Sequence, residues 1–570
     1  MHRKEIKEII VISIFSTSLI IFGISFFAFI MHNRNGPWIR IALPSVYYGT
    51  PFLAKDVDPQ YSWDSSSFEF SAHIWEGLFA INFFDPQFGL VPRLATSLGT
   101  YSPDGKELTI PLRQGIKFHD GTPFNADAVK FSFDRLAYLM NVSGILPLTC
   151  YYQIPTILHS LYEGPDGTPI INHTEIIDTY TVKFLLNRPF GSFRYLLAFP
   201  GSYILSPHST PSDDYIDPST AGPDTCVGTG PFILINIDSY EVRFHDYEDY
   251  HLGKSEIDSL VFCKILDDKK RKDAVLDGDI DIIIEKLYSW DDELEKDDNI
   301  VVFKDYPSWI FSYIRIFNQN INCTWRKAIS FAINYSRIIN SLTNNLSFRL
   351  NGILAPNIFG YDPTIIAIDY NLTYAREVMS NMGFGNVSWI DSQWRAAEFA
   401  SWNFSYRYKS NSEIALYEFL RDNLDQIGIN LTEGTESYQE WLEKYMHQIW
   451  SFDRFTWFNN QNFVLFNWYP DYSAAYNTLY AFFSSNGFLS GLFNIITDPW
   501  IEQKLEQASQ EFNDTARATI YSEVQRYNNK EFFPLIYLYH HPLQYLHDIH
   551  LISIPYNPTG LFYAYPIEFE

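Results

Sequence analysis

The stretch VPRLATSLGTYSPDGKELTIPLRQGIKFHDGTPFNADAVKFSFDRL, residues 91–136, carries the strongest structural signal in the chain. Pro-Asp-Gly at 103–105 stands between two runs of alternating apolar and polar residues, which predicts a β-hairpin with a tight turn. Further on, Asn125 is predicted to cap a helix that opens at Ala126, because a side-chain amide can accept a hydrogen bond from a free backbone N–H of the first turn. The stretch therefore predicts a hairpin followed by a helix.

His119 and Asp120 stand side by side in this stretch, which raises the question of a catalytic site. Asp120 is followed by Gly121, and Asp-Gly is a turn signal. No serine or cysteine elbow stands nearby to be activated by the histidine. We interpret His119 as a residue of the turn that leads into the helix.

Outward from this stretch, strand and helix patterns alternate along the whole chain. Residues 39–43 predict a strand, and residues 227–237 predict a loop that enters a strand. Residues 325–340 predict a helix, and residues 415–433 predict a helix, a glycine turn and a strand. Such mixing indicates α/β domains. With 570 residues the chain is too long for one core, and three or four units are expected.

The composition excludes one class of partner and favours another. The formal net charge of −26 argues against nucleic acid, because phosphate binding needs clustered Lys and Arg. Aromatic residues make up 18% of the chain. Some of them will form cores, and an excess of this size also allows an aromatic-lined cleft for a small ligand.

Residues 9–31 contain no charged side chain. Twenty-three residues at about 1.5 Å each can cross a hydrocarbon core of about 30 Å. The run is longer than that of a usual signal peptide and ends without a convincing cleavage site, so we predict an uncleaved transmembrane signal anchor. Basic residues before it favour a cytoplasmic tail at residues 1–8. The protein is thus expected in the cell membrane as a single-pass protein with its bulk outside.

Two features fit an extracellular location. Ten Asn-x-Ser/Thr sequons lie beyond the anchor, which makes the protein a candidate glycoprotein. The four cysteines permit two disulfides in three connectivities, and these cysteines are Cys150, Cys226, Cys263 and Cys323. Their spacing does not suit zinc or a redox pair.

The sequence offers no positive sign of enzymatic chemistry. It lacks HExxH, GxSxG and a phosphate-binding glycine loop, and it predicts no cofactor and no metal. Asp277, Asp279 and Asp281 alternate, but alternate residues of a strand share one face and do not wrap around an ion. We interpret the chain as a binding protein rather than an enzyme.

Residues 91–136 resemble the signature region of the family 5 extracellular solute-binding proteins, the oligopeptide, dipeptide and nickel type of ABC transporters. The likeness lies in P-x-L-A, the Asp-Gly turn, L-R-x-G-x-x-F-H-D-G-x-P and the helix start. Other segments agree in order, and the resemblance covers about residues 40–565. These segments are EGLF (76–79), VGTGPFIL (227–234), WRKAISFAINYSRII (325–339), GYDP (360–363) and FFPLIYLYH (532–540).

The resemblance implies a periplasmic-binding-protein-like fold of type II, with two α/β lobes, a hinge and an extra small domain. The ligand would lie in the cleft between the lobes and be handed to an ABC permease. From the motif positions we expect lobe I at 38–60, 170–266 and 480–570, the small domain at 61–169, and lobe II at 267–479.

The resemblance also implies a pocket residue. In peptide binders of the family a W-x-x-D segment offers an aspartate to the ammonium group of the ligand, and Trp468 and Asp471 have that spacing here. A loop-capping role for Asp471 is the alternative. Tyr472, Trp457 and Trp63 are further candidates for contact with the ligand.

The ligand class stays open between two chemistries. No basic residue stands within 455–480 to receive a ligand carboxylate, and the segment is rich in Asn and aromatic residues. These residue types also suit sugar rings, so the expected solute is a peptide or an oligosaccharide-like molecule. The alternatives from other classes are a cell-surface hydrolase and a sensory ectodomain that does not transport.

Overall fold

The computed structural model describes most of the chain after the predicted anchor. The described residues are 37–43, 57–62, 65–85, 87–142, 161–164, 167–265, 267–284, 294–316, 321–437, 440, 461–487, 489 and 498–570. Within these ranges, every helix is too short or too polar to cross a membrane. The predicted anchor at 9–31 lies outside the described residues and stays a prediction.

One sheet of 11 strands runs through the molecule. Its order is β15 (Ile429–Glu433), β14 (Ala400–Ser405), β16 (Phe463–Trp468), β12 (Ile300–Ile316), β17 (Leu535–Asp548), β11 (Ile282–Ile284), β1 (Trp38–Leu43), β10 (Ser259–Lys264), β9 (Glu241–Asp246) and β8 (Phe232–Ile237). A short strand, β13 (Phe348–Arg349), pairs with β17 off this path.

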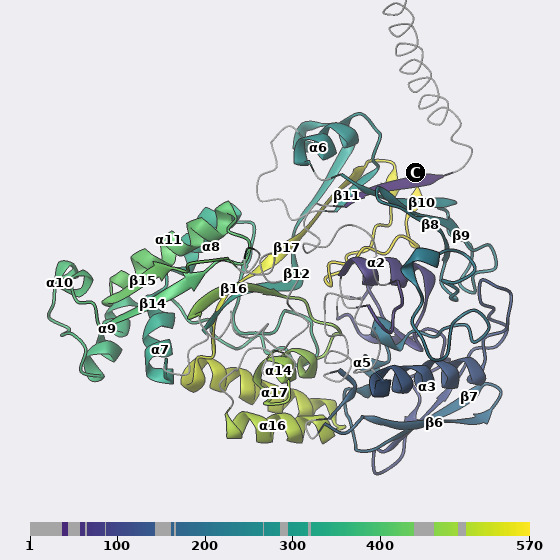
Figure 1. The fold of residues 1–570 in the computed structure, drawn as a ribbon, viewed down its shortest axis with the longest axis horizontal. Coiled ribbons are helices and arrows are strands. Elements are labelled where there is room, and N and C mark those ends of the chain that lie inside the picture. The colour runs from purple at the N-terminus through teal and green to yellow at the C-terminus, as the bar shows by residue number, and fades with distance from the viewer. Residues whose placement is uncertain are drawn as a thin grey trace, which may run out of the picture.

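The long strands β12 and β17 join the two halves of this sheet, as Figure 1 shows. The first part of β12 pairs with β17 where β17 also pairs with β11, and the last part of β12 pairs with β16. Between these parts Pro307 lies opposite Pro542, and the register shifts on both sides of that pair. Proline has no N–H for the ladder, and bulges bend strands, so the connection is weakest at this point.

The half of the sheet with β14, β15 and β16, which we call the β16 lobe, is covered by helices (Figure 1). They are α7 (Cys323–Ala332), α8 (Tyr335–Thr343), α9 (Leu372–Asn381), α10 (Asp391–Arg395) and α11 (Asn411–Asp425). The single helix expected at 325–340 is two helices. Asn334 interrupts it because its side chain accepts a hydrogen bond from the N–H of Arg337 and starts a new helix.

The other half of the sheet, with β1 and β8–β11, forms the β1 lobe, whose core holds β1, β8–β10 and helix α2 (Ser65–Ile74). A separate hairpin lies beside it, made of β2 (Phe79–Ile81) and β3 (Leu90–Pro92). Helix α6 (Asp268–Leu276) leads into β11. Near the C-terminus, β18 (Leu551–Ile552) pairs with β19 (Glu568–Phe569).

The opening stretch builds the small domain. Its four-stranded sheet has the order β4 (Thr100–Tyr101), β5 (Glu107–Pro111), β7 (Thr181–Leu186) and β6 (Ile171–Asp178), and helix α3 (Ala126–Val142) packs against it. The predicted turn at 103–105 is present, with Gly105 at φ +69°. The predicted cap is present too, since Asn125 Oδ1 accepts from the N–H of Ala128 at 3.2 Å.

His119 holds the small domain to the β1 lobe. Its Nε2 lies 2.9 Å from the carbonyl oxygen of Gly230, and its backbone N–H donates to the carbonyl of Gly228. Burial lowers the pKa of His119 to about 4, so the ring is neutral at physiological pH. The interpretation of His119 as a structural turn residue agrees with these contacts.

Three helices complete the β16 lobe on the side of the small domain: α14 (Ala475–Phe483), α16 (Pro499–Gln510) and α17 (Asp514–Tyr527). They lie beside α5 (Phe193–Leu196) and α3 at the lower edge of Figure 1. One hydrophobic core includes residues of these helices and of the small domain. The two lobes are therefore closed against each other in this structure.

Cys226, Cys263 and Asp281 have structural surroundings, as the following contacts show. Cys226, Cys263 and Cys323 are free thiols, and Cys150 lies outside the described residues. Burial raises the pKa of Cys226 to about 12 and that of Cys263 to about 11, which makes both unreactive. Asp281 accepts the N–H of Arg40 at 2.7 Å and ties β1 to its neighbour.

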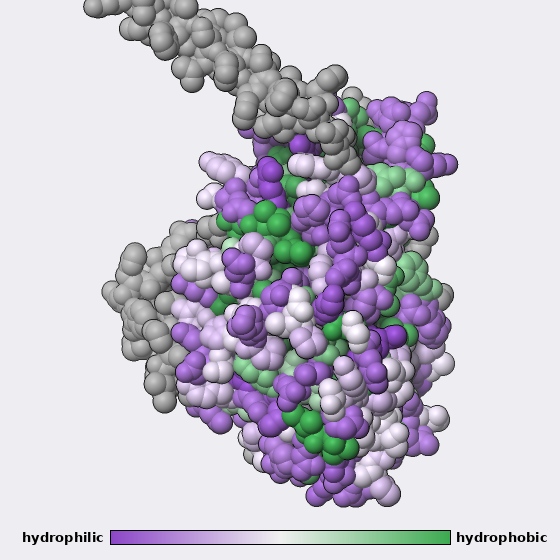
Figure 2. Space-filling model, turned by 90° about the vertical axis from the view of Figure 1, so that its right-hand side faces the viewer, coloured by the Kyte–Doolittle hydropathy of each residue, from purple (hydrophilic) through white to green (hydrophobic). Residues whose placement is uncertain are grey.

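The outer face of the β1 lobe and the small domain is hydrophilic over most of its area, with small separate hydrophobic patches (Figure 2). Exposed apolar side chains are scattered: Ile177 lies on β6, Ile235 on β8 and Tyr240 in the turn after β8. Scattered apolar residues of this kind are normal for a water-facing surface.

Candidate ligand site

The predicted W-x-x-D segment lies where β16 ends. Trp468 is 7% exposed, its indole N–H donates to Thr478 Oγ1 at 3.3 Å, and its ring meets Phe482 edge-on. Trp468 thus fixes the end of the strand by packing, and a small part of its surface stays accessible. Its predicted contact with a ligand stays a prediction.

Asp471 is held in place by Asn477 of α14. The backbone N–H of Asp471 donates to Asn477 Oδ1 at 2.9 Å, and Asn477 Nδ2 donates to Asp471 Oδ2 at 2.7 Å. Its second oxygen, Oδ1, has no hydrogen-bond partner among the described residues. One carboxylate oxygen is thus fixed by Asn477, and the other can accept a hydrogen bond from a ligand.

Burial raises the pKa of Asp471 to about 7, and the hydrogen bond from Asn477 lowers it only in part. The side chain is nevertheless partly exposed. The carboxyl group thus loses most of its hydration but keeps some contact with solvent. Carboxyl groups with perturbed pKa values are often found at binding sites.

Tyrosines surround this carboxyl group. Tyr472 is 4% exposed, and burial together with the charges of its neighbours, including Asp471, holds its pKa far above the usual range. Tyr162, which follows the small domain's helix in sequence, also senses the charge of Asp471 and hydrogen-bonds Ser202 at 2.7 Å. Asp471 therefore faces the small domain across the boundary between the lobes.

Arg407 is the functional candidate that the sequence analysis missed. It follows β14, whose last residues pair in parallel with the first residues of β16, so Arg407 lies beside the middle of β16. Its guanidinium group lies 5.7 Å from the ring centre of Phe466 and 5.1 Å from that of Tyr408. No carboxylate among the described residues pairs with it.

Arg407 lies over the side of β16 that faces the small domain. Phe466, under the guanidinium group, stacks on Tyr313 at 6.0 Å and belongs with Trp468 to the core that faces the small domain. Ligands of open α/β sheets bind at the carboxyl ends of parallel strands. The search for a basic residue failed because it covered residues 455–480, whereas the cation comes from a neighbouring strand about 60 residues earlier.

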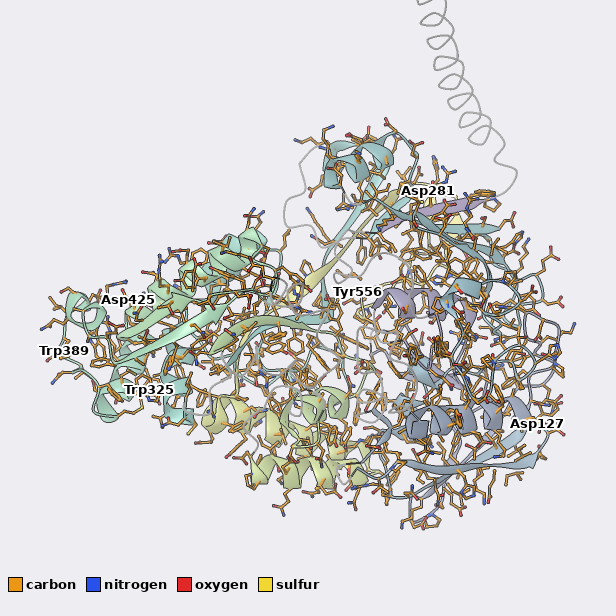
Figure 3. The ribbon with its side chains drawn as sticks, viewed as in Figure 1. Asp127, Asp281, Trp325, Trp389, Asp425 and Tyr556 are labelled. Atoms are coloured by element: carbon orange, nitrogen blue, oxygen red, sulfur yellow. The ribbon has the colours of Figure 1, made fainter. Side chains whose placement is uncertain are left out.

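The tryptophan predictions have different outcomes. Trp63 and Trp457 lie outside the described residues. Trp389 and Trp402 pack in the β16 lobe, where Trp389 meets Trp394 and Phe399. Figure 3 shows Trp389 and Trp325 at the far end of that lobe, away from the centre of the molecule where Tyr556 lies.

A set of contacts closes the boundary between the small domain and helices α16 and α17; we call it the seam. Arg188 forms an ion pair with Glu506, and the N–H of Gly191 donates to the carbonyl of Ser509 at 2.7 Å. Phe512 packs edge-on against Tyr101 with ring centres 4.8 Å apart.

The seam fits so closely that a Cβ on Gly105 would lie 2.3 Å from the ring of Phe512. The turn predicted from the sequence is thus a docking point for the opposite lobe.

A Ser-His pair lies near the join of the lobes and bears on the hydrolase alternative. Ser312 Oγ lies 2.8 Å from His541 Nε2, and Ser312 also donates to Asn467. Ser312 is 1% exposed and His541 is 5% exposed, and both are in the middle of the sheet. A substrate cannot reach a hydroxyl at that depth, so the pair links strands.

The strand order and the two lobes define an α/β fold of the periplasmic-binding-protein type. Solved structures agree. The peptide-bound periplasmic binding protein DppA of Helicobacter pylori superposes with a TM-score of 0.71 at 22% identity, over 94% of this chain and 98% of that one. The substrate-binding protein CtaP of Listeria monocytogenes gives 0.73 at 17% identity, over 94% and 99%.

The chain belongs to the bacterial extracellular solute-binding proteins, family 5, whose model matches residues 89–490. The glutathione-binding protein GsiB of Escherichia coli K12 is 29% identical over 397 residues, which cover 66% of this chain and 69% of the relative. GsiB of Shigella flexneri matches to the same extent. The family resemblance recognised in the sequence is thereby confirmed.

Proposed function

We propose that the protein captures peptides with free ends in the crevice between its lobes and delivers them to an ABC permease. The observation that carries the proposal is a pair of opposite charges at β16: Asp471 follows the end of this strand, and Arg407 stacks on Phe466 within it. Asp471 accepts the ligand's ammonium group through Oδ1, and Arg407 receives its carboxylate. A neutral sugar would leave both charges without partners, which disfavours the oligosaccharide alternative.

Relatives support the same class of ligand. The dipeptide-binding protein of Pseudoalteromonas sp. SM9913 was solved with Met-Leu, and it superposes at a TM-score of 0.68 and 19% identity over 93% of this chain. GsiB is named for glutathione, which is itself a peptide. An enzymatic role has no support from the deeply buried Ser312–His541 pair.

Capture requires the lobes to part and close. The join at Pro307 and Pro542 in β12 and β17 is the proposed hinge, because it lacks ladder hydrogen bonds and carries register shifts on both sides. We also propose that residues 9–31 anchor the protein in the cell membrane, with residues 1–8 in the cytoplasm and the binding lobes outside. In that location the sequons are open to glycosylation.

The test is calorimetry of the full-length protein in lipid nanodiscs with three forms of one short peptide: free, N-acetylated and C-amidated. Blocking either end should weaken binding by about 10- to 100-fold, the usual effect of losing one charge-assisted hydrogen bond. Asp471→Asn should abolish the penalty for N-acetylation, and Arg407→Gln the penalty for C-amidation. Arg337→Gln, at an exposed ion pair on α8, is the matched control.

Equal affinity for the free and doubly blocked peptides would reject the proposed pair of charges. Tight binding of a neutral oligosaccharide without peptide binding would reject the ligand class.

A further inference from the structure

A second cavity, of about 440 Å³, lies on the β1 lobe. Its walls come from β3, from the turn at Leu252 and from the segment after β18, and Tyr563 and Tyr565 form part of the lining. Neither Asp471 nor Arg407 lines it. Its volume lies in the range of small-molecule sites.

Apolar side chains are left in water at this cavity. Phe84 is 70% exposed and Leu252 is 43% exposed, although large apolar side chains are usually buried. With the two tyrosine rings they form an apolar wall that a flat molecule can cover.

Two guanidinium groups share the cavity. Arg113 Nε donates to the backbone carbonyl of Arg93 at 2.7 Å, which holds the two side chains next to each other. Arg93 Nη1 donates to the hydroxyl of Tyr250 at 3.3 Å. The other nitrogens of both groups have no hydrogen-bond partner within the described part of the chain. Both groups can therefore still donate hydrogen bonds to an anion in the cavity.

A buried network holds Arg93 from behind. Glu76 accepts from the hydroxyls of Tyr250 at 2.8 Å and Thr229 at 3.0 Å, and His251 Nε2 lies 2.9 Å from it. Burial opposes the ionisation of Glu76, but these hydrogen bonds and the charge of Arg93 outweigh it and keep its pKa below the usual value. Because Glu76 is committed to this network and lies 3.8 Å from Arg93 Nη1, it orients Arg93 without covering its remaining edge.

One carboxylate stands at the rim. Glu568 is exposed and accepts from the hydroxyl of Ser553 at 3.1 Å. Ser553 has φ +60°, a left-handed conformation that is costly for a residue other than glycine and that is found at binding sites more often than elsewhere.

We propose that this cavity binds a small organic anion, whose carboxylate or phosphate group lies against Arg93 and Arg113 and whose flat apolar body covers Tyr563 and Phe84. The site goes beyond the proposed peptide function, because none of the residues assigned to the peptide lines it. Glu568 repels the anion weakly from the rim and so limits its affinity.

The experiment uses the full-length protein in nanodiscs and two anionic probes, benzoate and phenyl phosphate, with benzamide as the neutral probe of the same shape. Ligand-observed NMR titration should give a Kd of about 1 mM or below for at least one anion, as expected for a probe of this size. Benzamide should bind at least about tenfold more weakly. The stronger of the two anions tells whether the site prefers a carboxylate or a phosphate.

Two substitutions should change the affinity for the anion in opposite directions. Arg113→Gln should weaken the preferred anion by about tenfold or more, because a charge-assisted hydrogen bond is lost. Glu568→Gln should strengthen it, because the repulsion is removed. Glu568 is exposed, so its variant tests the proposal even if Arg113→Gln fails to fold. Arg407→Gln should leave anion binding unchanged, which separates this site from the peptide site.

The proposal is overturned if benzamide binds as well as the anions, or if neither anion binds. It is also overturned if Glu568→Gln weakens binding, or if Arg407→Gln abolishes it. Peptide binding should survive in Arg113→Gln and Glu568→Gln, so failure of the anion site and failure of the peptide proposal can be told apart.

Discussion

Peptide affinity should depend on pH through Asp471, and the structure gives the form of that dependence. The pKa of this carboxyl group is about 7 in the ligand-free protein, because burial disfavours its charged form. Only the charged form can hold an ammonium group in a buried pair. Affinity should therefore be complete above pH 7 and be lost as the pH falls, which is the direction expected when binding favours deprotonation.

The size of the effect follows from linkage. Well below the pKa of the free protein, affinity should fall by about tenfold per pH unit. Because the group is half protonated at its pKa, about 50-fold is lost between pH 7 and pH 5, or about 2.3 kcal/mol. At the other end, the ligand's α-amino group titrates at about 7.7–8.0 and loses its charge. The profile for a free peptide should therefore be bell-shaped, with its maximum between about pH 7 and pH 8.

Calorimetry of one short peptide between pH 5 and pH 9, in buffers of different ionisation enthalpy, measures both the affinity and the protons released. Asp471→Asn should remove the acid limb of the profile, because the variant's amide does not titrate. It should also remove the alkaline limb, because the amide gives no advantage to the charged form of the ligand's amino group. An N-acetylated peptide should lose the alkaline limb. An affinity that stays constant from pH 5 to pH 7, or an acid limb that persists in Asp471→Asn, would refute the reasoning.

Three further predictions follow from the described contacts. Asp471→Asn should raise the melting temperature of the ligand-free protein at pH 8. The raised folded-state pKa of about 7 means that the folded protein loses stability as the pH rises from about 4 to 7 and Asp471 ionises. This loss is at most about 4 kcal/mol of the free energy of unfolding, and access of water to the carboxyl group makes it smaller. Phe512→Ala should empty the seam beside Gly105 and shift the ligand-free protein toward an open form, seen as a larger radius of gyration in X-ray scattering; an unchanged radius would show that the seam does not hold the lobes. Asp58→Ala should strand the buried guanidinium of Arg135, its ion-pair partner, and cost about 3–5 kcal/mol in chemical denaturation, whereas a loss below 1 kcal/mol would contradict a buried pair.

Local chemistry made much of the fold predictable from the sequence. The Pro-Asp-Gly turn, the Asn125 cap and the helix–glycine–strand unit at 415–433 each depend on residues a few positions apart, and each is present. The prediction of one helix at 325–340 was wrong, and here too the cause is local. Apolar spacing continues through Asn334, but the amide side chain offers the backbone a cap, and the helix restarts there.

The site was harder to predict because its two charges come from different parts of the chain. Asp471 could be found from the W-x-x-D spacing, but its raised pKa depends on burial against residues from elsewhere in the chain. Arg407 is far from Asp471 in the sequence, and only the parallel pairing of β14 with the start of β16 brings it next to Phe466. A better guide would have been the residues that follow each predicted parallel strand.

In the proposed mechanism, closure of the lobes is coupled to the charge of Asp471, and this coupling makes closure depend on the solute that is bound. Closing the seam removes water from the carboxyl group, and without a cation that step is penalised, as its pKa of about 7 shows. An ammonium group in the crevice compensates the buried charge, so the penalty falls only when a suitable ligand is present. The apolar contacts of the seam, such as Phe512 against Tyr101, favour closure whichever solute is bound. Selectivity therefore arises from the uncompensated charge that opposes closure, more than from the contacts that favour it.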